Sequence, residues 1–172
     1  MKQYPIINSV VNPEVDSEGY IKEYVVKAHH NFSIAIDSEH GLTTPNIKDI
    51  ESKSIMQINS ELKDLIEKVK RGALTQADFE DGTFSVSSVG NIGGKYFVPT
   101  ILRPQTCIIA IGKANKVPKY TGDGAAHAWE PIDSISFSMS ADHRIIDGAT
   151  VARFSQTMKN YLENPNLMLI SQ

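Results

Sequence analysis

The run from Thr106 to Gly112 is apolar without a break, and it constrains the fold more than any other segment. Side chains alternate between the two faces of a sheet, so a strand that is apolar throughout must be covered on both faces. Two other segments, Thr83 to Val89 and Ile132 to Ser140, alternate apolar residues with serine or threonine. The sequence therefore predicts a sheet whose strands include all three segments, packed between other layers.

Two amphipathic helices are predicted on either side of these strands. The first runs from about Ile55 to Arg71 and begins with a capping box formed by Ser54 and Gln57. The second runs from about Ala149 to Glu163 and is stopped by Asn164-Pro165. The residues expected to form their buried stripes are Ile55, Ile58, Leu62, Leu65, Ile66 and Val69 in the first and Val151, Ala152, Phe154, Met158, Tyr161 and Leu162 in the second. The fold class is therefore α/β, with a mixed sheet flanked by helices.

Shorter elements are predicted between these segments. Strands are expected at Tyr24 to Ala28 and at Phe32 to Ile36, and a short helical turn from Thr75 to Asp78. The polar, glycine-containing stretch from Lys119 to Trp129 is expected to be the exposed hairpin loop between the last two strands.

Composition excludes several classes of protein. The chain has 172 residues, close to one domain, and 41% of them are hydrophobic. A net charge of −3 gives no general attraction to nucleic acid or to an anionic membrane. One cysteine, Cys107, excludes a disulfide framework and indicates a reducing compartment; its apolar neighbours favour a core residue over a nucleophile. The sequence predicts an intracellular protein with neither nucleic-acid nor membrane partners, and no apolar run is long enough to span a bilayer.

The segment from Ser140 to Gly148 contains the first candidate for chemistry. His143 follows directly on a predicted strand, and Asp147-Gly148 precedes a predicted helix. Such junctions hold side chains rigidly, and a neutral histidine can act as a general base. Asp147 can orient the surroundings, and Gly148 allows a sharp turn or the close approach of a ligand. The alternative reading of these residues alone is a structural histidine at a strand–helix turn.

A second candidate is the strand that runs into the glycine-rich loop from Ser87 to Gly94. A hydroxyl at the end of a strand can donate a hydrogen bond to a developing oxyanion. The same residues are also consistent with a phosphate-binding turn or a plain tight connection, and they match neither a P-loop nor a dinucleotide fingerprint.

No metal site is predicted. His29, His40 and His127 have no cysteine or carboxylate at metal-ligand spacing.

Together the two candidate segments resemble the catalytic domain of the dihydrolipoamide acyltransferases, the core component of 2-oxoacid dehydrogenase complexes. The resemblance covers nearly all of the chain and is most specific around His143. The matching motifs are Ser140-Ala141-Asp142-His143-Arg144-Ile145-Ile146-Asp147-Gly148-Ala149, Gly82-Thr83-Phe84 before Ser87-Ser88-Val89-Gly90, Tyr4-Pro5-Ile6-Ile7-Asn8, His30-Asn31, Gly41-Leu42-x-x-Pro45-Asn46 and Leu162-Glu163-Asn164-Pro165. At 36–42 and 161–169 the chain is most similar to the branched-chain type.

The resemblance implies a fold like that of chloramphenicol acetyltransferase, in trimers with active sites at subunit interfaces. It implies that His143 is the base that takes the thiol proton and that Ser87 stabilises the tetrahedral oxyanion, with the two residues from different subunits. It implies a supporting role for Asp147, and contacts to coenzyme A from Ser88, Gly90 and Gly148. The family usually has asparagine where this chain has Ser88.

The resemblance also implies substrates and partners. The substrates are coenzyme A and lipoamide, and the acyl group is branched-chain. The trimers build a large hollow core, expected to be a cubic 24-mer, which works with decarboxylase and dihydrolipoamide dehydrogenase components. The location is the mitochondrial matrix in a eukaryote and the cytoplasm in a bacterium.

From the resemblance we expect residues 1–172 to be the acyltransferase domain without its N-terminal portion, and without a lipoyl or subunit-binding domain. Two other functions stay open for such a chain. One is a catalytically inactive, truncated homologue that acts as a structural scaffold of a multimeric core. The other is a free-standing coenzyme A acyltransferase that acts on a small hydroxyl or amine.

Overall fold

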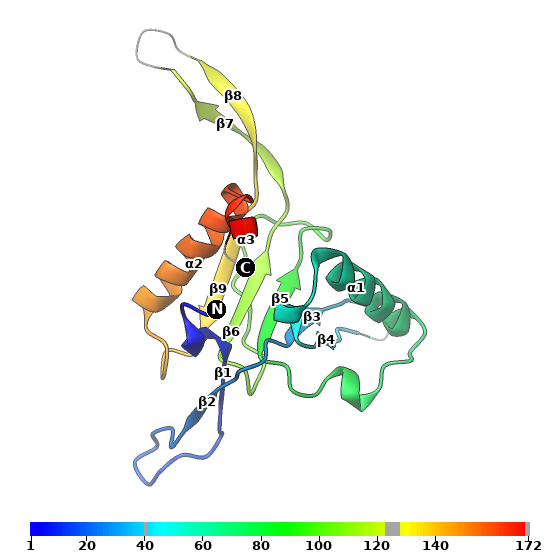
Figure 1. The fold of residues 1–172 in the computed structure, drawn as a ribbon, viewed down its shortest axis with the longest axis vertical. Helices are drawn as coiled ribbons and strands as arrows, with labels where there is room; N and C mark the ends of the chain where they lie inside the picture. Colours follow the sequence, from blue (N-terminus) through cyan, green and yellow to red (C-terminus); the bar gives the residue numbers. More distant parts are fainter. Residues whose placement is uncertain (40, 123–127, 171–172) are drawn as a thin grey trace.

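A five-stranded mixed sheet forms the centre of the molecule, in the order β4-β3-β5-β6-β9 (Figure 1). The computed structural model describes residues 1–39, 41–122 and 128–170. The strands are β3 (Phe32–Ala35), β4 (Asn46–Ile47), β5 (Phe84–Ser88), β6 (Cys107–Ile111) and β9 (Phe137–Ala141). β3, β5 and β6 are parallel, while β4 and β9 are antiparallel to their neighbours. The predicted mixed sheet is confirmed.

Two long helices flank this sheet, and two hairpins extend from it (Figure 1). The helices are α1 (Ile55–Lys70), α2 (Gly148–Glu163) and the short α3 (Leu167–Ile170), with 3-10 turns η1 (Pro5–Asn8), η2 (Ile50–Ser52) and η3 (Gln76–Asp78). The hairpins are β1 (Ser9–Val11) with β2 (Tyr24–Val26), and β7 (Asn115–Tyr120) with β8 (Trp129–Ser134). α1 contacts β4, α2 contacts β9, and the two hairpins project from opposite ends of the sheet. No described helix is both long enough and apolar enough to cross a bilayer.

The main core lies between the sheet and α2. Phe84, Cys107 and Ile109 come from the sheet, Phe154 comes from α2, and all four are less than a tenth exposed. Cys107 is fully buried, and this burial raises the pKa of its thiol to about 12. The thiol therefore stays protonated at neutral pH, and the prediction of a core cysteine is confirmed.

The opposite face of the sheet contains a buried polar network around Ser85. Ser85 Oγ donates to Gln105 Oε1 at 2.5 Å, and Gln105 Nε2 donates to Ser33 Oγ at 2.9 Å. A Cβ at Gly82 would lie 2.4 Å from Ser33 Oγ and 2.7 Å from Gln105 Nε2, so a larger residue would have to displace the side chains of this network. The alternation of β5 thus separates an apolar core from a buried hydrogen-bond network, which explains its serines.

α1 begins and ends close to the predicted residues. The capping box is present: Gln57 N donates to Ser54 Oγ at 3.2 Å, and Ser54 N donates to Gln57 Oε1 at 2.8 Å. The predicted stripe is buried only in its second half, at Leu65 and Val69, whereas Ile55 is 77% exposed. α1 packs on β4, a strand of two residues, which is too short to cover the whole stripe.

The prediction of one strand over 132–140 is wrong. The chain leaves the hairpin after β8, and β9 begins only at Phe137, because the two halves pair with different partners: β8 with β7 and β9 with β6. Between them the Ser136 carbonyl accepts from Gly112 N at 2.9 Å. The alternation of apolar and polar residues in the sequence runs across the break, so this pattern did not reveal where one strand ends and the next begins. The predicted loop at 119–129 is shorter at both ends, and its residues 123–127 lie outside the described ranges.

α2 also matches its predicted bounds, but its buried face is narrower. Phe154 is buried, whereas Ala152 and Leu162 are exposed, contrary to prediction. At about 100° per residue, these two lie about 160° and 80° around the helix from Phe154, away from the sheet.

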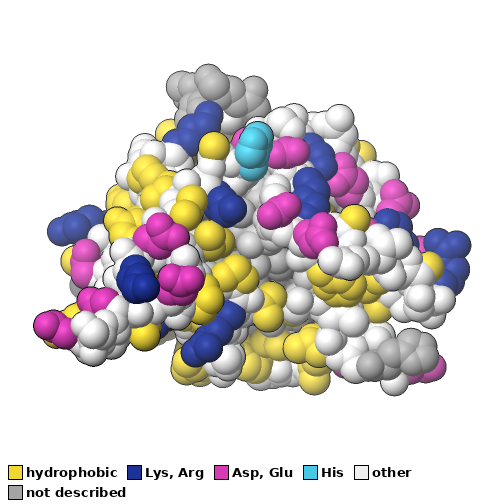
Figure 2. All heavy atoms as spheres, turned by 90° about the horizontal axis from the view of Figure 1, so that it is seen from below, with side chains coloured by type: hydrophobic (Ala, Val, Ile, Leu, Met, Phe, Trp, Pro, Cys, Tyr) yellow, Lys and Arg dark blue, Asp and Glu magenta, His cyan; other side chains and the backbone are white. Residues whose placement is uncertain are grey.

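The surface carries no single dominant charge on the face drawn in Figure 2. Acidic and basic side chains alternate there with apolar ones. This mixture agrees with the weak net charge and offers no continuous basic track for a polyanion.

Asp78 gives the fold a testable pH dependence. Its carboxylate accepts from Lys68 Nζ at 2.8 Å and from Thr75 N at 2.8 Å, and the hydrogen bond from Lys68 is the main cause that lowers its pKa from 3.8 to about 2. A carboxyl whose pKa is lowered by folding stabilises the fold above its unfolded pKa, and loses that effect as the pH falls towards 2.

We therefore expect Asp78→Asn to lower the melting temperature at pH 7 by roughly 2–4 °C, the shift that about 1 kcal/mol produces at this chain length. At pH 2 most of the difference from the wild type should be gone. Thermal unfolding of both proteins from pH 2 to pH 7 measures this, with Asp64→Asn on the exposed side of α1 as the control. A constant difference at all pH values would contradict the assignment.

Candidate active site

His143 lies on a tight turn that is anchored on both sides. Before it, Asp142 N donates to the Thr106 carbonyl at 2.8 Å and extends the pairing of β9 by one residue. After it, the Asp142 carbonyl accepts from Ile145 N at 3.1 Å and from Ile146 N at 3.0 Å, and Ile146 is 1% exposed in the core. His143 itself is exposed, and its imidazole has no hydrogen-bond partner among the described residues. The turn holds the main chain firmly and leaves the ring free for a ligand.

Asp147 caps α2. Its carboxylate accepts from Thr150 N at 2.8 Å and from Thr150 Oγ1 at 3.0 Å, and the main-chain hydrogen bond from Thr150 is the main cause that lowers its pKa. The carboxylate is therefore ionised at neutral pH. Its observed contacts fix the start of α2, four residues after His143.

Ser87 lies near the end of β5 between two alanines. It is opposite Ala35 of β3 and Ala110 of β6, so small side chains flank it on both sides. Ser87 is half-buried, and its hydroxyl has no hydrogen-bond partner within the described part of the chain. Ser88 is the last residue of β5 and is exposed. Both hydroxyls are available to a ligand.

The sheet places His143 and Ser87 far apart in one chain. Ala141, two residues before His143, is opposite Cys107 at the start of β6, whereas Ser87 is opposite Ala110 near its end. Three residues of strand and two strand spacings separate these positions, about 10 Å along the sheet and about 10 Å across it. Within one subunit the two side chains lie towards opposite ends of the sheet and do not form a common site.

The two candidate glycines differ in what their missing side chains allow. A Cβ at Gly90 would lie 2.9 Å from the Gly112 carbonyl oxygen and 3.1 Å from Lys113 Cα, so the main chains pack directly against each other. Gly148 is the first residue of α2, outside the left-handed region, and nothing lies within 4 Å of its Cβ position. The main chain at Gly148 therefore does not require glycine for a sharp turn, contrary to the first predicted role. The open space beside it is consistent with the second predicted role, the close approach of a ligand.

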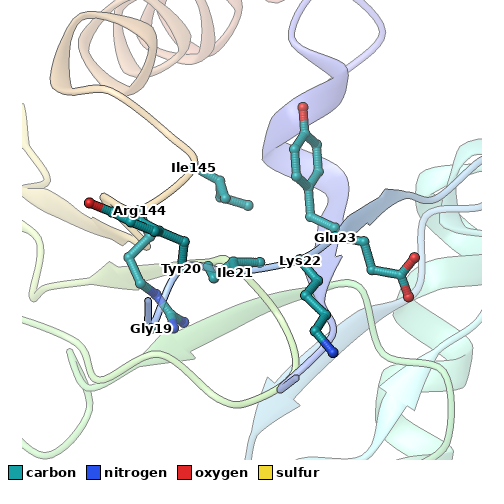
Figure 3. A pocket seen from close by; sticks show the side chains of 8 residues that line it. Gly19, Tyr20, Ile21, Lys22, Glu23, Arg144 and Ile145 are labelled. Atoms are coloured by element: carbon teal, nitrogen blue, oxygen red, sulfur yellow. The ribbon is translucent and has the colours of Figure 1, made fainter. Parts of the chain in front are cut away.

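A hollow of about 790 Å³ borders the histidine turn (Figure 3). It is lined by Arg144 and Ile145 and by residues 19–24 of the β1–β2 hairpin. The sequence predicted a strand from Tyr24 in this hairpin but no role for residues 19–24 in a site. In the structure, Tyr20 and Tyr24 are 68% and 46% exposed. In the sequence, nothing in the spacing of these tyrosines indicates that they lie near Arg144.

One group of possible metal ligands occurs among the described residues. His29 Nδ1 lies 2.9 Å from Asp49 Oδ1 and 3.9 Å from Glu51 Oε1. The sequence offers His29 no carboxylate at metal-ligand spacing, but folding brings Asp49 and Glu51 to it from twenty or more positions away. All three are exposed, and ion pairing accounts for the arrangement without a metal. His40 and His127 lie outside the described residues.

Comparison with known proteins places this site in a family. Residues 1–170 match the family of 2-oxoacid dehydrogenases acyltransferase (catalytic domain). The chain belongs to this family. The resemblance drawn from the motifs around His143 and Ser87 is thus confirmed.

Relatives of this acyltransferase domain come from animals, plants and bacteria. The chain is 41% identical over 167 residues to the lipoamide acyltransferase component of the branched-chain alpha-keto acid dehydrogenase complex, mitochondrial, of Caenorhabditis elegans, covering 97% of this chain and 35% of that protein. It is 36% identical over 170 residues to the dihydrolipoyllysine-residue acetyltransferase component of the pyruvate dehydrogenase complex of Staphylococcus aureus, covering 99% of this chain and 37% of that protein. The chain therefore spans about a third of the length of these relatives.

Solved structures confirm the fold of the acyltransferase domain. Azotobacter vinelandii dihydrolipoamide acetyltransferase, studied for the role of a serine, a histidine and an asparagine in its mechanism, matches with a TM-score of 0.85 and 32% identity over 98% of this chain and 65% of that one. The cubic core of a pyruvate dehydrogenase multienzyme complex matches with a TM-score of 0.86 and 30% identity over 98% of this chain and 65% of that one. Chloramphenicol acetyltransferase, at 14% identity, matches with a TM-score of 0.58 over 93% of this chain and 71% of that one, and confirms the predicted fold alone.

The glycines provide a prediction for this site. Gly90→Ala should lower stability by about 1–3 kcal/mol, because the new methyl group would overlap the main chain at Gly112. Gly148→Ala is the matched control and should leave the melting temperature unchanged or slightly higher, since the space there is open and alanine favours a helix. Equal melting temperatures for the wild type and Gly90→Ala would contradict the close packing.

Proposed function

We propose that this chain is the catalytic domain of a lipoamide acyltransferase, which transfers an acyl group from S-acyl-dihydrolipoamide to coenzyme A. The observation that carries the proposal is an exposed histidine, His143, on a turn anchored to the sheet and to the core. Membership of the acyltransferase family supports it, and the names of the relatives near 40% identity favour a branched-chain acyl group.

In the proposed mechanism, His143 is the general base. A thiol with a pKa near 8.5 is mostly protonated at pH 7, so neutral imidazole takes the proton of coenzyme A as its sulfur attacks the thioester carbonyl carbon. The carbonyl oxygen becomes an oxyanion, which accepts a hydrogen bond from Ser87 Oγ. When the tetrahedral intermediate collapses, the carbon–sulfur bond to dihydrolipoamide breaks, and the imidazolium returns the proton to the departing thiolate.

The remaining site residues support these two groups. Asp147 keeps the start of α2 in place through its contacts with Thr150. We assign contacts with coenzyme A to Ser88, Gly90 and Gly148: Ser88 is an exposed hydroxyl beside Ser87, and Gly148 leaves open space near the histidine turn. No metal takes part in the proposed chemistry.

The proposed active site lies between subunits of a homotrimer. The register of β5, β6 and β9 supports this, because His143 and Ser87 of one chain are separated by more than the length of a substrate thioester group. Trimers would assemble into a large hollow core, and the likeness to a cubic core favours a 24-mer.

Partners and location follow from the same family. The proposal gives the lipoyl group to a separate lipoyl domain, and it names decarboxylase and dihydrolipoamide dehydrogenase components as partners, in agreement with the complexes for which the relatives are named. The location is the mitochondrial matrix in a eukaryote, as for the mitochondrial relatives, and the cytoplasm in a bacterium.

His143→Ala tests the proposal directly. Acyl transfer from acyl-coenzyme A to dihydrolipoamide by the complete assembly should fall by at least about a hundredfold, the lower range for a general base. His29→Ala, which removes another exposed histidine, should keep the wild-type rate. Wild-type turnover by His143→Ala would overturn the assignment of His143 as the base, whereas a wild-type assembly without acyl transfer would favour a scaffold.

Ser87→Ala tests the second group. The proposed hydrogen bond strengthens only in the transition state, so kcat should fall by about 10²–10³ while KM changes little. Ser60→Ala on the exposed side of α1 is the matched control. A higher KM at unchanged kcat would show that Ser87 binds substrate without stabilising the oxyanion.

A further inference from the structure

The residues on either side of His143 bind each other. The Asp142 carboxylate accepts from Arg144 Nε at 2.9 Å and from Arg144 Nη2 at 2.5 Å. Its Oδ1 also accepts from the main-chain Arg144 N at 3.1 Å. These contacts form a two-pronged bridge across the peptide that carries the histidine, here named the Asp142–Arg144 clamp.

The clamp is attached to the sheet through Asp142. The Asp142 side chain is only 15% exposed, and its main-chain N–H is bonded to Thr106, next to β6. The hydrogen bond from Arg144 is the main cause that lowers the pKa of Asp142, and Arg103 adds a smaller attraction. The carboxylate is therefore ionised at neutral pH, and the clamp is closed whenever the turn is formed.

We propose that Asp142 and Arg144 are positioning residues that hold the His143 main chain in the orientation required for proton transfer. This inference rests on the proposed function of His143. A general base must lie within hydrogen-bond distance of the proton that it takes, and an error of about 1 Å can cost a hundredfold in rate. The imidazole has no partner among the described residues, so the turn beneath it is what fixes its position.

Stability does not account for the clamp. Arg144 is 56% exposed, and this exposure limits what the pair contributes to the free energy of folding, although Asp142 is only 15% exposed. Ile145 and Ile146 already close the turn through main-chain hydrogen bonds to Asp142. The effect of the clamp should therefore be seen in the reaction rate more than in the melting temperature.

A direct role of Arg144 in substrate binding is the competing explanation. Arg144 lines the hollow beside the turn, together with residues 19–24 of the hairpin (Figure 3). Its Nε and Nη2 atoms are committed to Asp142, however, which leaves fewer donors for a ligand. A positioning residue affects kcat, whereas a binding residue affects KM, and the experiment separates the two.

The test uses Asp142→Asn, Arg144→Gln and the double variant in the complete assembly. Asp142→Asn keeps an oxygen that can accept from Arg144 N but removes the charge that binds the guanidinium. Each single variant should lower kcat by about tenfold or more with KM for both substrates within about twofold. Because both act through one clamp, the double variant should be no slower than the slower single variant. Glu67→Gln and Lys70→Gln, which break an exposed pair on α1 with a 2.7 Å contact, are the matched controls and should keep kcat.

Each other outcome overturns the inference. Unchanged kcat in both single variants, or multiplied losses in the double variant, would show that the clamp does not position the base. A raised KM at unchanged kcat would make Arg144 a binding residue. If Asp142→Asn does not assemble, Arg144→Gln decides alone, because it alters only an exposed side chain. His143→Ala in the same assay distinguishes a failure of the proposed function from a failure of the clamp. If His143→Ala is fully active, the proposed function of His143 is wrong. If His143→Ala is inactive while the clamp variants have normal kcat, only the proposed role of the clamp is wrong.

Discussion

The pairing of β6 with its two neighbours determines where every proposed catalytic group lies. β5 runs parallel to β6, and β9 runs antiparallel to it. β9 therefore begins at the end of the sheet where Ser87 lies, and it ends at the opposite end, just before His143. The register is fixed because the two faces of the sheet differ: one packs apolar side chains against α2 and the other holds the Ser33–Gln105–Ser85 hydrogen bonds, so a shift by one residue would exchange them. Ser87 and His143 are consequently held towards opposite ends of one rigid sheet, and a common site requires a second subunit.

The histidine turn depends on the same sheet. Thr106, the residue before β6, anchors Asp142 through its carbonyl, and Ile146 anchors the far side of the turn in the core. Asp147 then starts α2 through its contact with Thr150. The side chain of His143, the proposed general base, is thus exposed on a segment whose main chain is bonded on both sides, an arrangement that suits the proposed role.

Much of this could be predicted from local patterns, and the failures have a physical cause. The strands β5 and β6 and both long helices follow from hydrophobic period, and the Ser54–Gln57 capping box from short-range chemistry. The split between β8 and β9 could not be predicted, because alternation records that a strand has two faces but not which strand it pairs with. β7 was missed because Pro118 interrupts its pattern, opposite Pro131 of β8.

The candidate site shows the same limit. The positions of His143, Ser87 and Asp147 were predicted from motifs, whereas the hollow beside Arg144 and the approach of Asp49 to His29 join segments that are distant in sequence. No local period carries such information. The exposure of the first half of α1 could not be predicted either. How much of the helix is covered depends on β4, a strand that is distant in sequence from most of the helix and only two residues long.

The claim that one active site takes His143 and Ser87 from two different chains is tested most directly by complementation. Inactive His143→Ala and Ser87→Ala subunits would be co-expressed in equal amounts, purified as mixed assemblies and assayed for acyl transfer. With random mixing in a closed ring, about a quarter of the sites receive both intact residues, so activity should return to about a quarter of the wild-type value. Mixed assemblies as inactive as either parent would contradict a site shared between subunits.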